Sequence, residues 1–450
     1  MSHLSVAKFG GTSVANYPAM QSCANIVIAD PNTRVVVLSA SAGITNLLVA
    51  LANGCEEAER NKLLNEVRQI QENILTELKD DSRVRPKIEA LLANITSLAE
   101  AANLATSLAL TDELISHGEM MSSLIFVEVL RELQIEATWL DVRTIVTTNS
   151  HFGKAAPNDE QTRQNCDNLL KPLIERGELV ITQGFIGRDE QGKTTTLGRG
   201  GSDYSAALLA EVLNAQDVLI WTDVAGIYTT DPRIVPNAQR IDTMSFSEAA
   251  EMATFGAKVL HPATLLPAVR SNIPVYVGSS KAPQDGGTWV TRNPQPRPTF
   301  RAIALRRDQT LLTLSSLNML YAQGFLANIF TILAKHKISV DTITTSEVSV
   351  ALTLDKTGSA SSGKSLLSQE LIEELSQFCT VKVDTGLSLV ALIGNELHTA
   401  SGVAKRIFET LDAYNIRMIS YGASTNNICL LADSDKADDI VRSLHRSLFE

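Results

Sequence analysis

The segment Ser5-Val-Ala-Lys-Phe-Gly-Gly-Thr-Ser-Val14 combines a short apolar run, a lysine and two glycines. It predicts a strand that ends at Lys8, followed by a helix that Thr12 or Ser13 could cap. Glycines let backbone N–H groups approach an anion, a helix N-terminus adds a favourable dipole, and a lysine adds a full charge. Two interpretations follow, a phosphate-binding turn or an ordinary strand–helix turn, and the Walker A pattern is absent.

Outward from this segment, short β-branched runs alternate with helical patterns over the first ~290 residues. The apolar runs 35–38, 179–181 and 218–221 predict strands, and residues 56–105 have the periodicity of two or three amphipathic helices. Strands that are apolar on both faces and separated by helices are typical of a parallel sheet covered on both sides. We therefore predict an α/β fold with a mostly parallel sheet.

Two further small-residue turns join a predicted strand to a predicted helix, at 39–46 and 194–203. In the second turn, Ser202 or Asp203 could simply cap the next helix. That interpretation leaves Arg199 unexplained, because a guanidinium between glycines can reach a carboxylate. Open α/β sheets bind ligands beyond the carboxyl ends of their strands, so the three turns predict one crevice.

The C-terminal third contains an internal repeat that follows a proline-rich linker. Pro294, Pro296 and Pro298 block both a helix and a central strand. Beyond them, Gly324 and Gly402 begin two segments whose apolar residues match at a constant offset over some forty positions. Each copy is expected to run strand, turn, helix, strand, strand. The predicted domains are 1–293, a linker at 294–304, and two α+β modules at 305–385 and 386–450.

The composition excludes several classes of protein. The chain has 450 residues and a formal net charge of −11, which argues against a protein that binds a nucleic-acid backbone. The five cysteines are dispersed, which favours reduced thiols and neither disulfides nor a zinc site. The uncharged stretch 35–55 is long enough for a membrane span, but polar residues and glycines interrupt it. With no signal peptide apparent, we expect a cytoplasmic protein.

The remaining polar motifs are individually ambiguous. Glu119 precedes an apolar run and could face solvent, Lys258 could extend along an apolar surface to solvent, and His261 before a proline could cap a helix. Residues 220–233 leave a predicted strand and carry Asp223, Tyr228 and Arg233. The sequence shows no nucleophile–base pair, metal cluster or protein-kinase signature.

Taken together, the motifs closely resemble those of aspartokinases, in the amino-acid kinase family. The matching segments, in family order, are Lys8-Phe-Gly-Gly-Thr-Ser13, Ser39-Ala-Ser-Ala-Gly43, His117-Gly-Glu119, Gly198-Arg-Gly-Gly-Ser-Asp203, Trp221-Thr-Asp223, Tyr228-Thr-Thr-Asp-Pro-Arg233 and Phe255-Gly-Ala-Lys258. The resemblance spans essentially the whole chain. It implies a carbamate kinase-like α/β/α sandwich followed by two ferredoxin-like ACT domains.

The resemblance also implies an activity, the transfer of phosphate from ATP to the β-carboxylate of L-aspartate. This is the entry step to lysine, threonine and methionine. The implied catalytic residues are Lys8, Asp203 and Lys258. The implied ATP-binding residues are Lys8, Gly10, Gly11, Thr222, Asp223, Tyr228, Arg233, Lys258 and Val259. The implied substrate residues are Thr45, Glu119, Arg199, Gly200, Gly201 and Ser202, with Arg199 on the α-carboxylate and Glu119 on the α-ammonium. Mg²⁺ would bridge the ATP phosphates, largely coordinated by water, with no protein metal site.

Feedback inhibition by L-lysine is implied by similarity to the lysine-sensitive members of the family. The implied lysine site lies in the first ACT copy, at Met319, Gly324, Phe325, Leu326, Ser339, Val340, Asp341, Thr345, Ser346 and Glu347. Asp341 and Glu347 would attract the ammonium groups, and the second copy has Ile419 and Thr425 in their places. ACT domains usually pair, so a homodimer or a tetramer is expected. Ala225 and Ala322 depart from the family pattern, the second beside the expected lysine site.

Two alternatives stay open from the sequence. A sister kinase that acts on glutamate, acetylglutamate or UMP would share the fold and the Lys8 turn. A non-catalytic amino-acid sensor built on the ACT pair would bind lysine without turnover, although Lys8, Arg199, Asp203 and Lys258 are all present.

Overall fold

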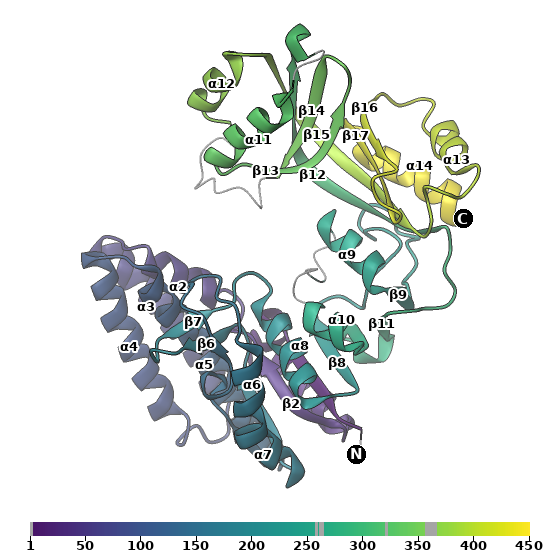
Figure 1. The fold of residues 1–450 in the computed structure, drawn as a ribbon. Helices are drawn as coiled ribbons and strands as arrows, with labels where there is room; N and C mark the ends of the chain where they lie inside the picture. The colour runs from purple at the N-terminus through teal and green to yellow at the C-terminus, as the bar shows by residue number, and fades with distance from the viewer. Residues whose placement is uncertain (1–2, 257–259, 261–264, 320–322, 356–366) are drawn as a thin grey trace. The chain divides into compact units, whose positions relative to one another are not determined.

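The computed structural model describes residues 3–256, 260, 265–319, 323–355 and 367–450 (Figure 1). The chain forms two compact units. The first comprises Met1–Ile227, Arg240–Ala249 and Lys258–Gln295, and the second comprises Tyr228–Gln239, Ala250–Ala257 and Pro296–Glu450. Two short segments that the sequence places in the N-terminal domain therefore group with the C-terminal unit.

The first unit is built on an eight-stranded sheet with the order β3-β5-β2-β1-β8-β10-β11-β9. β10 and β11 pair antiparallel, and all the other neighbours in this sheet run parallel. The strands are β1 (Ser5–Phe9), β2 (Thr33–Leu38), β3 (Ala137–Trp139), β5 (Leu179–Gln183), β8 (Asp217–Thr222), β9 (Thr243–Ser245), β10 (Val275–Ser279) and β11 (Gly287–Thr291). The mostly parallel sheet predicted from the sequence is confirmed.

Helices cover the sheet because its central strands are apolar on both faces. They are α1 (Tyr17–Ala29), α2 (Ile44–Ala52), α3 (Glu57–Leu75), α4 (Arg85–Leu104), α5 (Leu108–Glu132), α6 (Asp159–Asn165), α7 (Lys171–Glu175), α8 (Gly201–Leu213) and α10 (Leu266–Ser271), while α9 (Phe246–Thr254) crosses between the units. Ala7 and Phe9 of β1 pack in one core with α1 to α5. Side chains alternate along a strand, so Lys8 between them faces the opposite side of the sheet.

The predicted strands at 35–38, 179–181 and 218–221 are confirmed within β2, β5 and β8, and residues 56–105 form α3 and α4. The predicted helix caps are wrong. The side chain of Asn16 caps α1, because a short 3₁₀ turn at Gly11–Val14 intervenes after the glycines. The N-cap of α8 is Gly200, which has no side chain to donate or accept a bond. Ser202 and Asp203 are therefore inside the first turn of α8.

A second, three-stranded sheet has the order β4-β6-β7. Its strands are β4 (Thr147–Thr148), β6 (Ile186–Asp189) and β7 (Thr194–Thr196). β7 leads directly into the turn at Gly198–Gly200, which precedes α8. This small sheet therefore sets the position of Arg199.

The second unit contains a six-stranded antiparallel sheet with the order β13-β14-β12-β15-β17-β16 (Figure 1). Its elements are β12 (Phe300–Ser315), α11 (Phe325–Lys335), β13 (Ser339–Thr345), β14 (Ser349–Asp355), α12 (Gln369–Ser376), β15 (Thr380–Gly394), α13 (Val403–Thr410), β16 (Ile416–Tyr421), β17 (Asn427–Asp433) and α14 (Ala437–Phe449). Each copy of the repeat runs strand, turn, helix, strand, strand as predicted. β12 and β15 pair along the middle of the sheet, and β15 runs through the boundary placed at 385/386.

The described residues add two negative findings. None of their helices has the length and apolar character needed to cross a membrane. All five cysteines are free thiols. Burial raises the pKa of the Cys166 thiol to about 12, so this thiol is protonated at neutral pH and is a poor nucleophile.

Candidate active site

The carboxyl ends of the central strands are joined by hydrogen bonds between the loops that follow them. The N–H of Ser39 donates to the carbonyl of Phe9 at 3.2 Å, and that of Gly184 donates to Leu38 at 2.8 Å. On the other side of β1, the N–H of Ser280 donates to Thr222 at 2.8 Å. The loops after β1, β2, β5, β8 and β10 therefore meet at one edge of the sheet. Two of the three turns predicted to line one crevice follow β1 and β2 of this sheet, whereas the turn at 194–203 follows β7 of the small sheet.

An ion pair lies at the centre of this edge. Nζ of Lys8, near the end of β1, is 2.6 Å from Oδ1 of Asp203 in the first turn of α8. The two side chains are only 11% and 14% exposed. A cation held next to the N-terminus of α8, and kept largely from water, is a strong electrostatic site for phosphate.

The two glycines after β1 have different roles. The N–H of Gly10 already donates to the carbonyl of Trp221 at 3.1 Å, so in this structure it is not directed at a ligand. A Cβ on Gly11 would lie 2.8 Å from the carbonyl oxygen of Ala40. Gly11 is therefore required so that the loops after β1 and β2 can approach each other.

Glu119 lies in the middle of the long helix α5 and is fully buried, which contradicts the alternative that it faces solvent. Its Oε1 accepts a hydrogen bond from the N–H of Ala40 at 3.2 Å. Its Oε2 is buried and has no hydrogen-bond partner among the described residues. Burial raises the pKa of Glu119 to about 8. A buried carboxylate oxygen without a partner fits a cationic group of a ligand, since an ammonium would satisfy both its charge and its lone pair.

Two hydroxyl residues lie in the same loop region. Thr45 is half-buried in the first turn of α2, which begins after Gly43 in a left-handed conformation. The hydroxyl of Ser41 is buried and unpartnered among the residues that the structure describes. Sequence reasoning named Thr45 and missed Ser41, whose only signal was its place within the turn at 39–46.

Arg199 lies in an exposed turn between Gly198 and Gly200, whose φ angles are +79° and +70°. The turn packs closely against the loop after β5, because a Cβ on Gly201 would lie 2.7 Å from the ring of Phe185. Ser202 is equally close to Gly184, where an added Cβ would lie 2.6 Å from the Cβ of Ser202. The glycines thus allow the turn to pack against the loop after β5, while Arg199 itself is exposed to solvent.

Of the proposed nucleotide residues, Thr222 and Asp223 lie in the first unit, where β8 ends. The hydroxyl of Thr222 donates to Oδ1 of Asp223 at 3.2 Å. Tyr228 and Arg233 belong to the second unit, where the guanidinium of Arg233 pairs with Asp231 at 2.6 Å. Lys258, Val259 and His261 lie outside the described residues.

Hydrogen bonds and apolar packing attach the segment that contains Tyr228 to the second unit. The hydroxyl of Thr229 is 2.9 Å from Nε2 of the fully buried His445 on α14. Val235 packs in one apolar core with β12, β15 and α14. This segment is thus part of the folded core of the C-terminal unit.

The residues expected to bind lysine surround α11, β13 and the turn that follows β13. Gly324 is the N-cap of α11 with φ +84°, Phe325 is buried in the apolar core, and Leu326 is 37% exposed. Asp341 pairs with the guanidinium of Arg306 on β12 at 2.9 Å. Its charge is therefore already balanced within the chain, whereas Glu347 is exposed. Tyr321 and Ala322 lie outside the described residues.

The comparisons with known proteins agree with this geometry. Residues 3–279 match the amino acid kinase family, and residues 390–448 match an ACT domain. The chain is 62% identical over 450 residues to lysine-sensitive aspartokinase 3 of Escherichia coli (strain K12), with 100% of both chains covered. The chain belongs to the aspartokinases of the amino acid kinase family. Its identity to the chloroplastic aspartokinase 3 of Arabidopsis thaliana is 35%, over 99% of this chain and 81% of that one.

Solved aspartokinases have the same fold over the whole length. The structure of Escherichia coli aspartokinase III in complex with aspartate and ADP, in the R-state, matches with a TM-score of 0.89 and 61% identity, covering 100% of both chains. The T-state of that aspartokinase, in complex with lysine and aspartate, matches with a TM-score of 0.88 and covers 100% of both chains. The carbamate kinase-like fold and the ACT region expected from the motifs are therefore confirmed.

Proposed function

We propose that this chain transfers the γ-phosphoryl group of ATP to the β-carboxylate of L-aspartate, forming 4-phospho-L-aspartate and ADP. The observation that carries the proposal is the edge of the parallel sheet in the first unit. There the Lys8–Asp203 ion pair supplies a buried cation, and Glu119 supplies a buried carboxylate oxygen without a partner. The phosphates of the donor meet the cation of Lys8, and the ammonium of the amino acid stabilises the ionised form of Glu119.

The chemistry requires little more than alignment and neutralisation of charge. The nucleophile is an aspartate carboxylate, ionised at neutral pH because its pKa is near ~3.9. One of its oxygens attacks the γ-phosphorus as the bond from that phosphorus to the ADP oxygen breaks. No proton moves, so no general base is needed. Lys8 neutralises charge on the transferred group, and Asp203 holds Lys8 in place.

Aspartate is recognised by groups of the first unit. Glu119 binds the α-ammonium of aspartate and Arg199 its α-carboxylate, with Thr45 and Ser202 assisting. The backbone N–H of Gly11 and the polar end of β8 at Thr222 and Asp223 bind the nucleotide. The resemblance to aspartokinases adds Tyr228, Arg233, Lys258 and Val259 to the nucleotide-binding residues. Mg²⁺ would enter on the ATP phosphates with its waters and would supply charge neutralisation there.

Regulation is proposed to follow the lysine-sensitive relatives. L-Lysine binds the first ACT copy, with Glu347 on an ammonium group and backbone N–H groups near Gly324 on the carboxylate. The copies of two chains pair into a homodimer or tetramer. The enzyme works in the cytoplasm, where its five thiols stay reduced.

Phosphoryl transfer to a panel of acceptors tests the proposal. ADP release from Mg·ATP is measured with L-aspartate, L-glutamate, N-acetylglutamate or UMP, and the acyl phosphate is trapped with hydroxylamine. Turnover with aspartate alone supports the proposal. Faster turnover with another acceptor would assign the chain to a sister kinase, and lysine binding without any turnover would make it a sensor.

A further inference from the structure

The two groups proposed to recognise aspartate come from different elements. Glu119 is buried in α5, whereas Arg199 lies in the exposed turn after β7. Two side chains can bind the two ends of one small molecule only if the distance between them stays fixed. The short strand β7 and two glycines with left-handed φ do not by themselves fix the turn.

Asp112 joins these two elements. It lies on α5 about two turns before Glu119 and is 1% exposed. Its Oδ2 accepts hydrogen bonds from the N–H groups of Thr196 and Gly153, both at 2.8 Å. Its Oδ1 accepts from the hydroxyl of Thr196, also at 2.8 Å. Thr196 is the last residue of β7, so one buried carboxylate holds the strand immediately before the Arg199 turn.

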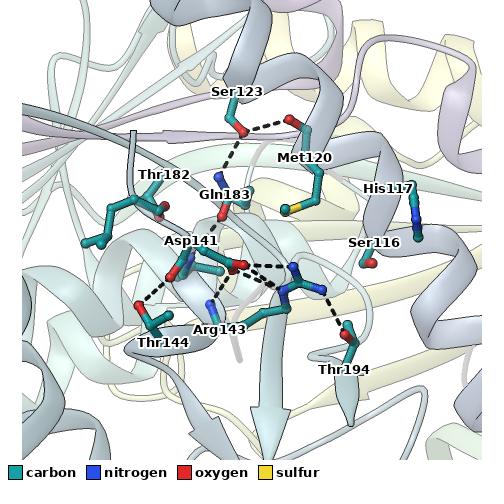
Figure 2. Close-up of polar contacts among 12 residues, drawn as sticks. Ser116, His117, Met120, Ser123, Asp141, Arg143, Thr144, Thr182, Gln183 and Thr194 are labelled. Carbon is teal, nitrogen blue, oxygen red and sulfur yellow. Dashed lines mark hydrogen bonds and ion pairs between the residues drawn. The ribbon is translucent and has the colours of Figure 1, made fainter. Parts of the chain in front are cut away.

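A second set of bonds attaches the same small sheet to its surroundings, as Figure 2 shows. The guanidinium of Arg143 is paired with Asp141 at 2.7 Å and donates to the hydroxyl of Thr194 at 3.0 Å. Near it, the side chain of Gln183 donates to Ser123 on α5 at 2.9 Å. The bond from Arg143 to Thr194 holds the start of β7, and the bond from Gln183 to Ser123 joins β5 to α5. At its other end, on the side of Arg199, backbone bonds from Ala155 to Thr196 and from Leu197 to Phe185 hold the strand, and Asp112 adds the side-chain bonds that tie it to α5.

We propose that Asp112 is a positioning residue for aspartate recognition, which fixes the Arg199 turn relative to Glu119. The inference rests on the proposed function of Glu119 and Arg199. Asp112 touches neither substrate nor nucleotide. It acts because a fully buried carboxylate with three donors allows one geometry only, and any displacement leaves it charged and unsatisfied.

The first test substitutes Asp112→Asn. The amide keeps the volume but turns an NH₂ group toward donors, so the loop must shift. The KM for aspartate should rise about tenfold or more, while the KM for ATP stays within twofold, because misplacement of a binding group by an ångström has effects of this size. Thr196→Val removes only the hydroxyl bond and should give a smaller rise in the same direction. An unchanged KM for aspartate in both variants would overturn the proposal.

The matched control is Asp189→Asn. Asp189 is 3% exposed and also accepts three hydrogen bonds in the same small sheet, from the N–H groups of Gln191 and Lys193 and the hydroxyl of Ser150. The two N–H bonds close the β6–β7 turn, at the opposite end of β7 from Arg199, and the bond from Ser150 ties this turn to the loop after β4. Asp189→Asn should lower the melting temperature as much as Asp112→Asn does and leave the KM for aspartate unchanged. Equal rises in KM in both variants would assign Asp112 a structural role only.

A double-mutant cycle separates failure of this proposal from failure of the proposed function. Arg199→Ala alone should raise the KM for aspartate, and adding Asp112→Asn to it should raise that KM no further, because the positioned group is gone. Additive effects of the two changes would refute the positioning role. If Arg199→Ala alone leaves the KM for aspartate unchanged, the assignment of Arg199 has failed and the positioning role of Asp112 falls with it, whereas additive effects refute the role of Asp112 alone.

Discussion

At the scale of single residues, Lys8 and Glu119 have the environments that most clearly indicate function. Both side chains are buried and ionisable, and an apolar residue would fill either position at a lower cost in stability. Such groups cost stability unless they are paired. Lys8 is paired with Asp203, whereas one oxygen of Glu119 has no partner in the described chain.

Lys8→Ala is expected to lower kcat by about 10²–10³-fold, because a fixed cation next to the transferred phosphoryl group is lost. It also leaves Asp203 unpaired, so the melting temperature is measured alongside. Steady-state ADP release gives kcat, and Lys87→Ala on the exposed face of α4 is the control. If Lys8→Ala keeps more than a tenth of the wild-type kcat, Lys8 has no part in the mechanism.

Glu119→Gln should change how the stability of the ligand-free protein depends on pH. The pKa of Glu119 is raised from 4.5 to about 8, so the folded state keeps a proton that the unfolded state loses. Stability of the ligand-free protein therefore falls as pH rises between these two values. The variant lacks this loss and should be more stable than wild type at pH 9, by on the order of 1–3 kcal/mol in urea unfolding.

The same substitution should abolish the pH dependence of aspartate binding. An ammonium requires ionised Glu119, so the wild-type KM for aspartate should fall as pH rises toward about 8. Glu119→Gln should raise this KM and flatten its profile, with the KM for ATP unchanged. A wild-type profile that is flat between pH 6 and 9 would show that Glu119 does not hold the ammonium.

At the scale of elements, the contact between α5 and the loop after β2 places Glu119 against Ala40. Gly118, next to Glu119, makes this contact possible. A Cβ there would lie 2.7 Å from the Cβ of Ala40 and 3.1 Å from Ile44. Helix propensity favours alanine over glycine by ~1 kcal/mol, so a helix considered alone would be stabilised by the change.

Gly118→Ala is nevertheless expected to destabilise the protein by about 1–3 kcal/mol, since overpacking outweighs propensity. It should also raise the KM for aspartate, because the loop that donates to Glu119 is displaced. Thermal unfolding and kinetics measure both effects, and Ser97→Ala on α4 provides a helix control. A more stable Gly118→Ala variant would mean that the loop moves aside at little cost.

At the scale of the whole molecule, the two units contain different sets of the residues proposed to be functional. The first contains the Lys8–Asp203 pair and the groups proposed to bind aspartate, and the second contains the ACT repeat together with the segments Tyr228–Gln239 and Ala250–Ala257. Thr229 bonds to His445 on the last helix, and Glu251 accepts from Ser424 and Asn427 near β17. The segment that carries Tyr228 and Arg233 therefore folds with the proposed regulatory unit. An effector bound there can bias two states of the enzyme.

Glu347→Ala should raise the lysine concentration for half-inhibition at least about tenfold, an ordinary coupling energy, with uninhibited kcat little changed. Glu347 is chosen over Asp341 because Asp341 already pairs with Arg306, so its loss would disturb the fold. Inhibition curves at fixed aspartate give the result, and Glu409→Ala on α13 is the control. Unaltered inhibition that is competitive with aspartate would place lysine in the active site instead.

The sequence by itself determined the parallel sheet, the C-terminal α+β repeat and the glycine-containing turns, because each depends on local periodicity or on glycines at strand ends. The sequence also indicated a function for Lys8, Arg199 and Asp203, because these charged residues lie at glycine-containing turns that follow predicted strands. The predicted N-caps of α1 and α8 were wrong. Several nearby side chains are able to cap each helix, and the path of the backbone selects among them.

Only the tertiary structure decided which charges are balanced and which are not. Glu119 is buried because α5 crosses the loop after β2, Asp341 is neutralised by a strand distant in sequence, and Asp112 joins α5 to β7. The burial of a side chain and the pairing of its charge depend on neighbours that are distant in the sequence. A residue's own sequence context does not contain them, and they decide which acid binds a ligand and which one supports the fold.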